Sequence, residues 1–188
     1  MLKYIEEAGK YVEITGFRNL SIEDAEEFVK ASRKGAPQSS CVQFFNAELV
    51  ATWQHLYFAV LNALLAFKNE RNISKSVAME TMLYASAQRQ IRKAIDLMGV
   101  KCSSANVAVV VIGESAESVE SFLSEVSKRV GEKNDDCVLE LSKEKVQGIR
   151  EAFGITETEV ETVMEKDNGE DALVDLVIER VALLSTQL

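Results

Sequence analysis

The stretch ANVAVVVIG, residues 105–113, decides the fold class. Its residues are apolar and mostly β-branched, which is typical of a β-strand that is covered on both faces. Two weaker patterns, KYVEITGF at 10–17 and CVQFF at 41–45, predict further strands. CVLEL at 137–141 predicts a fourth. We therefore expect residues 105–113 to form a central strand.

The rest of the chain is predicted to be largely helical. Apolar residues recur at helical spacing over 21–35, 48–70, 74–87, 88–98, 115–131, 142–154, 156–166 and 170–187. Thr156 and Glu159 have the spacing of a capping box at the start of a helix. The expected fold is a single α+β domain over residues 1–188, with a mixed β-sheet of about four strands packed with several helices.

Composition narrows the classes of function. The net charge is −9, so any contact with nucleic acid must be local rather than a broad coating. Three isolated cysteines favour a reducing, cytoplasmic setting and fit no structural zinc site. The longest apolar run, at 107–112, is too short to span a membrane, and the N-terminus has no signal-peptide core. We predict a soluble cytoplasmic protein that does not contact a membrane.

No motif in the chain indicates catalysis. His55 is the only histidine, and it lies inside a predicted helix with no neighbouring nucleophile, so we expect it at the surface or half-buried. The turn VIGES at 111–115 has one glycine and lacks the remaining positions of a phosphate-binding loop. No acidic stretch has the ligand spacing of an EF-hand. We predict a binding protein that is not an enzyme and uses no metal or cofactor.

Positive charge is concentrated in one segment. Residues 55–101 contain 7 basic and 3 acidic side chains, whereas residues 102–188 contain 8 and 19. Arg89, Arg92 and Lys93 share one face of a predicted helix, opposite an apolar face formed by Ile91, Ala94, Ile95 and Met98. Further polar candidates precede them: Lys68, Arg71, Asn72 and Lys75. Two readings remain open: a solvated face paired with acids such as Glu80, or a patch that binds phosphate or a partner.

The last predicted helix has two apolar stripes. The first, suited to core packing, contains Leu173, Val174, Val177, Ile178, Val181 and Leu184. The second contains Ala172, Leu176 and Leu183 and is separated from the first by Arg180. Either the helix is buried on all sides, or the second stripe contacts another protein.

The segment HLYFAVLNALLAFKNERNISKSVAMETMLYASAQRQIRKAIDLMGVK, residues 55–101, resembles the kinase-binding subunits of the KEOPS complex, the PRPK-binding protein family, in its archaeal form. ERNISKSVAMETMLYASAQRQI, at 70–91, is the most specific part. The resemblance continues more loosely through NVAVVVIG at 106–113, FGITETEV at 153–160 and VIERVALL at 177–184.

The resemblance implies a non-catalytic subunit of the complex that forms threonylcarbamoyladenosine in tRNA. Such a subunit binds the small atypical kinase, which acts as an ATPase, and contacts the threonylcarbamoyl transferase subunit only indirectly. Archaeal members are also implicated in gripping the single-stranded 3′ CCA end of tRNA. The alternative is a pure protein–protein adaptor of the kinase that does not touch tRNA.

Candidate site residues lie within the matching segments; the resemblance does not fix the individual contacts, which are our own inference. The tRNA role falls on Lys68, Arg71, Asn72, Lys75, Arg89, Arg92 and Lys93. The kinase role falls on Leu176, Arg180 and Leu183. Tyr84 is either a core residue or a stacking platform for a base, and Glu80 and Gln88 are candidates for holding the helices together.

Overall fold

The strand predicted from residues 105–113 is the centre of the β-sheet. The computed structural model describes residues 1–35, 40–164 and 168–187. In it, β4 (Val107–Gly113) lies between β2 and β3 in the strand order β1-β2-β4-β3. All seven residues of β4 are buried, which confirms the expected central strand.

The sheet is antiparallel throughout, and not mixed as we predicted. β2 (Lys10–Phe17) and β3 (Cys41–Asn46) both pair antiparallel with β4, and β1 (Leu2–Ile5) pairs antiparallel with β2. Because β4 separates them, β2 and β3 run in the same direction without ever being neighbours. Whether neighbouring strands are parallel or antiparallel depends on the order of the strands in the sheet, and the sequence pattern does not reveal that order.

The fourth strand was assigned to the wrong segment. Residues 137–141 do not extend the sheet, because they include a short 3-10 helix, η2 (Asp136–Leu139). The Asp135 side chain caps this turn. The ammonium group of Lys145 donates hydrogen bonds to the carbonyl of Val138 in the turn, to that of Glu140 directly after it, and to that of Val50 in another loop. The strand that completes the sheet is β1 at the N-terminus, which we did not predict.

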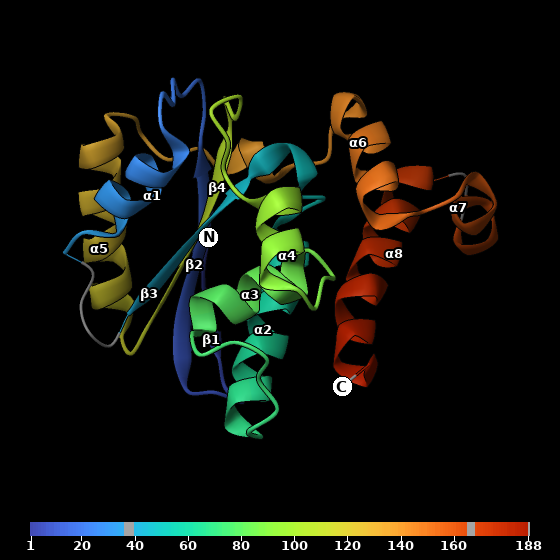
Figure 1. Cartoon of the computed structure of the whole chain (residues 1–188), viewed down its shortest axis with the longest axis horizontal. Coiled ribbons are helices and arrows are strands. Elements are labelled where there is room, and N and C mark those ends of the chain that lie inside the picture. Colours follow the sequence, from blue (N-terminus) through green and yellow to red (C-terminus); the bar gives the residue numbers. More distant parts are fainter. Residues whose placement is uncertain (36–39, 165–167, 188) are drawn as a thin grey trace.

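Helices cover both faces of the sheet and complete an α+β fold, as expected (Figure 1). The helices are α1 (Ala25–Arg33), α2 (Trp53–Lys68), α3 (Val77–Ala85), α4 (Ile91–Met98), α5 (Ala116–Val130), α6 (Lys143–Phe153), α7 (Glu157–Val163) and α8 (Gly169–Leu183). Alternate residues of β4 belong to two separate cores. Val107, Val109 and Val111 pack with residues of α1 and α5, while the intervening residues pack with α2, α3 and α8.

The helix boundaries refine the predictions in two places. The predicted helix at 48–70 is broken, because a 3-10 turn, η1 (Ala47–Leu49), precedes α2. The segments 74–87 and 88–98 contain two separate helices, which begin only at Val77 and Ile91, and Ala87 in the turn between them has a positive φ of 50°. Arg89 therefore lies before α4, so the prediction that it shares a helix face with Arg92 and Lys93 was wrong. The capping box at the start of α7 is confirmed, whereas the predicted end of that helix at 165–166 lies outside the described residues.

Candidate binding surfaces

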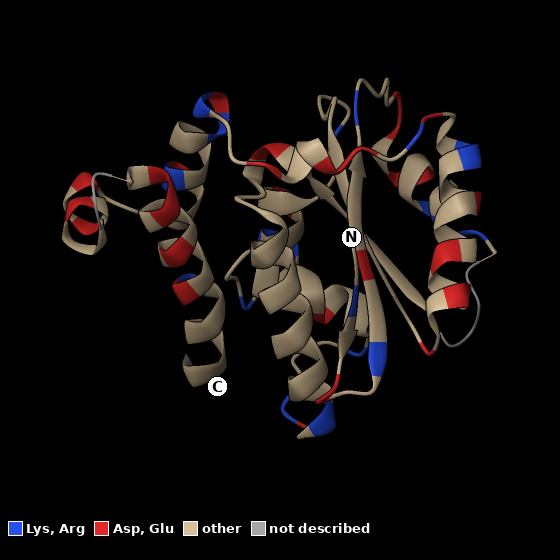
Figure 2. Ribbon diagram, turned by 180° about the vertical axis from the view of Figure 1, so that it is seen from behind, with Lys and Arg blue, Asp and Glu red and all other residues tan. Residues whose placement is uncertain are grey.

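The predicted tRNA-binding residues lie in two groups at opposite ends of α3. The group before α3, which we call the loop group, contains Lys68, Arg71, Asn72 and Lys75. The group after α3, which we call the α4 group, contains Arg89, Arg92 and Lys93. All seven residues are exposed, and one group precedes and the other follows α3 in the chain, a helix of nine residues that is roughly 13 Å long. Figure 2 shows basic residues where α2 ends, and acidic residues along α7 and the first half of α8.

A buried carboxylate shapes the loop group. Glu80, in the first turn of α3, is 0% exposed. Its two oxygens accept hydrogen bonds from the backbone N–H of Ile73, at 3.0 and 3.1 Å, and one of them accepts from that of Ser74, at 2.7 Å. The Asn72 side chain donates to the Ser74 carbonyl at 2.8 Å. Glu80 therefore organises the backbone that presents the cations, rather than neutralising one of them.

The cations differ in how firmly they are held. Lys68 donates to the carbonyl of Glu7 in the β1–β2 turn at 2.7 Å, which fixes the end of α2 against the sheet. Arg92 has a 94% exposed side chain and lies 4.0 Å from Asp96, a pair that contributes little in water. Lys68 thus has a structural contact, while Arg92 projects into solvent.

A small cavity adjoins the loop group. Arg71 and Tyr84 line it together with Asn62 and Asn69, and its volume is about 210 Å³. Tyr84 is 2% exposed, which favours its core role over base stacking. Burial raises the pKa of Tyr84, and the neighbouring Glu80 carboxylate raises it further. The tyrosine therefore stays neutral and helps to form the floor of a polar hollow.

A larger and more apolar cavity is lined in part by α4, although none of the three cations of the α4 group lines it. It measures about 460 Å³ and is lined by Met79, Met82 and Ile95 on one side and by α1 and β3 on the other. Ile91 and Ile95 belong to the predicted apolar face of α4, yet they are 44% and 43% exposed. Only Ala94 and Met98 of the predicted apolar face are buried, because α4 rests on α3 along a narrow stripe. The α4 cations thus adjoin exposed apolar side chains.

His55 is fully buried, so our expectation of a surface or half-buried residue was wrong. Its Nδ1 accepts from the Ala51 N–H at 3.3 Å, and its Nε2 lies 2.8 Å from the Ala85 carbonyl, which assigns the proton to Nε2. Its ring meets Phe153 of α6 edge-on at 5.5 Å. The imidazole therefore joins the start of α2 to the end of α3, where the turn to the α4 group begins. Burial lowers the pKa of His55 to about 4.

We expect the free energy of unfolding to fall by ~3 kcal/mol between pH 6.5 and pH 4 through His55 alone. The unfolded chain binds a proton near the ordinary pKa of 6.5, whereas the native imidazole stays neutral down to about pH 4. The contribution is complete above pH 6.5 and is lost as the pH falls to about 4. Urea unfolding at successive pH values measures it. A His55→Gln variant should be less stable at pH 7. The slope of its free energy of unfolding against pH should be smaller by the equivalent of about one proton, and equal slopes in the two proteins would contradict the assignment.

The predicted kinase-binding residues do not form one exposed stripe. Leu176 is 4% exposed and belongs to the core with Leu173 and Val177, so of the two alternatives for the second stripe, burial holds for this residue. α8 is flanked by α2, α6 and α7, and this packing encloses more of it than helical spacing suggested. Leu183, at the end of α8, is 40% exposed.

Arg180 is held by acidic neighbours. It forms ion pairs with Glu159 of α7 and with Glu179, the latter at 3.5 Å. Hydrogen bonds from the Thr156 backbone, and then from Arg180, lower the pKa of Glu159 to about 2. Arg180 therefore ties α8 to the capping box of α7, and Leu183 is the remaining candidate for direct apolar contact with a partner.

These observations define an α+β protein whose candidate sites are exposed basic and apolar surfaces. Among the described residues there is no group of three or more His, Cys, Asp or Glu placed to hold a metal ion, and no described helix has the length and apolarity to cross a bilayer. The family described as kinase binding protein CGI-121 matches residues 17–185. The chain is also 34% identical over 142 residues to the regulatory protein Cgi121 of Methanocaldococcus jannaschii, covering 76% of this chain and 81% of that protein. The chain belongs to the CGI-121 family of kinase-binding regulatory proteins.

Proposed function

We propose that this chain is a non-catalytic, cytoplasmic subunit of the KEOPS complex. In this role it binds the small kinase/ATPase and helps to recruit tRNA through the 3′ CCA end. Through the kinase it would act indirectly on the threonylcarbamoyl transferase subunit. The family supports kinase binding, and the tRNA role rests on the loop and α4 groups together with the sequence resemblance.

The observation that supports the tRNA role is that exposed cationic side chains lie near surface cavities. Arg71 of the loop group lines the smaller cavity, and Ile95, one turn from the exposed Arg92 of the α4 group, lines the larger. Single-stranded RNA requires cations for phosphates and pockets or apolar surfaces for unstacked bases. The net charge of −9 favours contact at these groups over contact elsewhere, because the rest of the surface repels phosphate.

Reversing one cation in each group, Arg71→Glu with Arg92→Glu, is expected to weaken tRNA binding about a hundredfold at low salt. Each lost phosphate contact should also reduce the slope of log affinity against log salt by roughly 0.7. Filter binding with intact tRNA and with tRNA lacking CCA measures both effects. The wild type should discriminate between the two tRNAs, and the variant should not.

A matched control is Lys128→Glu with Lys143→Glu, which makes the same charge change on exposed residues of α5 and α6. It should change tRNA affinity much less, and both double variants should still co-purify with the kinase. If the two double variants bind tRNA equally well, the chain is an adaptor of the kinase with no direct tRNA contact.

A further inference from the structure

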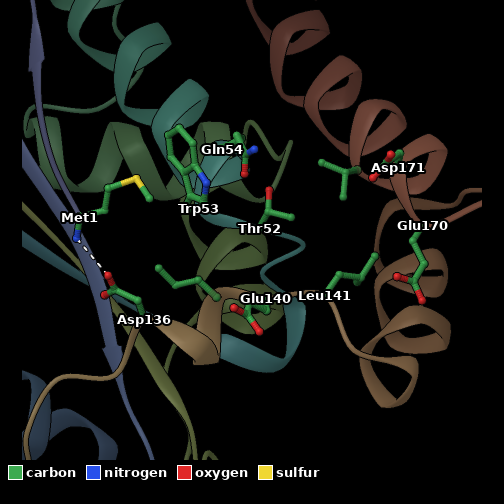
Figure 3. A pocket seen from close by; sticks show the side chains of 11 residues that line it. Met1, Thr52, Trp53, Gln54, Asp136, Glu140, Leu141, Glu170 and Asp171 are labelled. Atoms are coloured by element: carbon green, nitrogen blue, oxygen red, sulfur yellow. Dashed lines mark hydrogen bonds and ion pairs between the residues drawn. The ribbon is translucent and has the colours of Figure 1, made fainter. Parts of the chain in front are cut away.

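A third surface lies away from the loop group, the α4 group and Leu183. It is a groove of about 550 Å³ between the start of α2, η2 and the start of α8. Figure 3 shows Glu140 on the η2 side of the opening, Glu170 and Asp171 on the α8 side, and Trp53 and Gln54 at the start of α2. No lysine or arginine is among its described lining residues.

The acidic side chains at this groove are only partly used by the fold. Asp136 accepts a hydrogen bond from Thr15 and lies 3.5 Å from the N-terminal ammonium group of Met1, which also lines the groove, and Asp171 accepts a hydrogen bond from Asn168. No hydrogen bond or ion pair joins the carboxylates of Glu140 and Glu170 to another described residue. Among the described residues, no three of these carboxylates lie close enough together to hold a metal ion. Their spread suits several cationic groups on a flexible chain.

Two buried polar atoms at the groove lack partners. Thr52 Oγ1 and Gln54 Oε1 are shielded from solvent and have no hydrogen-bond partner among the described residues. Both residues flank the start of α2, and Figure 3 shows both side chains directed toward the groove. The Gln54 oxygen can only accept a hydrogen bond, whereas the Thr52 hydroxyl can donate or accept one. A buried polar atom without a partner is costly, so a ligand that brings N–H groups to the Gln54 oxygen would be favoured here.

The apolar parts of the groove suit the stem of a long basic side chain. Leu139 forms part of the floor, and Val174 and Trp53 line the walls. The chain's own Lys3 already places its ammonium group 5.1 Å from the centre of the Trp53 ring, so this ring accepts a cation in the structure itself. Lysine and arginine bury their methylene stems against such surfaces while their charged ends reach carboxylates.

We infer that this groove binds a lysine- and arginine-bearing segment of a partner protein. The inference rests on charge complementarity, on the cation already seated on Trp53 and on the unpartnered acceptors, and it is independent of the proposed tRNA role. Asp171 precedes Leu183 by twelve residues of α8, roughly 18 Å. A segment in this groove can therefore bind while another protein contacts Leu183.

The test uses Trp53, the only tryptophan, as a built-in reporter. The full chain is titrated with the peptide acetyl-GRGKGRG-amide and with acetyl-GQGQGQG-amide, and tryptophan fluorescence is followed at two salt concentrations. The basic peptide should give a saturable change that weakens with salt, with an affinity about tenfold or more above that of the neutral peptide. Equal responses to the two peptides would overturn the inference.

Matched variants locate the binding. Glu140→Gln with Glu170→Gln should weaken binding of the basic peptide about tenfold, whereas Glu132→Gln with Glu161→Gln, which removes two exposed acids elsewhere, should change it less than about twofold. Equal losses in the two double variants would reduce the effect to net charge and overturn the inference. Spermidine is titrated as well, and binding as tight as that of the peptide would assign the groove to small polycations instead.

Discussion

Replacing Leu183 by arginine is expected to abolish co-purification with the kinase while leaving the fold intact. Leu183 is 40% exposed at the end of α8, and no other member of the predicted stripe is a large exposed apolar residue. A guanidinium forced into an apolar contact would remain desolvated without a partner, so we expect a loss of about a thousandfold in affinity, ~4 kcal/mol. Pull-down with the kinase, together with a thermal melt, measures both parts of the expectation.

Two control variants separate an interface from a core effect. Val163→Arg introduces the same charge on α7 at 41% exposure and should leave kinase binding unchanged. Leu176→Arg places the charge in the core and should unfold the protein. Kinase binding retained by a folded Leu183→Arg variant would place the interface elsewhere.

The parts of the fold that were predictable depend on local pattern. β4 was identified because a strand covered on both faces requires apolar side chains at every position. The start of α7 was identified because a capping box is a contact between residues three apart, and Thr156 and Glu159 form it as expected. The exposure of the candidate tRNA residues also follows from local charge, because lysine and arginine are rarely buried without a partner.

The unpredicted parts depend on contacts between distant residues. Residues 137–141 have a strand pattern, but Lys145 and the Asp135 cap hold them in a 3-10 turn. Val138 of that turn lies over Gly16 of β2, where a Cβ atom would come within 2.0 Å of a Val138 methyl group. Leu176 and His55 are buried by α-helices that only the tertiary structure brings against them. No local pattern indicates such burial.

Glu80 is the clearest case of a residue whose structural role the sequence did not define, and it leads to the second large expectation. Glu80→Gln should lower the free energy of unfolding by ~4 kcal/mol, because one oxygen that accepts backbone N–H groups is replaced by an amide group that only donates. The loop from Arg71 to Lys75 would lose its anchor, so tRNA affinity should fall about tenfold although no cation has been changed. Urea unfolding and filter binding measure the two effects.

A control variant that is destabilised as much as Glu80→Gln is needed to distinguish an effect on the loop conformation from an effect on overall stability. Phe122→Ala removes a buried ring from α5, in the core on the opposite face of the sheet, and should cost about 3–5 kcal/mol. At a temperature where both variants are folded, it should bind tRNA like the wild type. Similar tRNA binding by both variants would show that Glu80 acts only through stability. A selective loss in Glu80→Gln would support the view that this carboxylate positions a binding loop, since the cations themselves are unaltered.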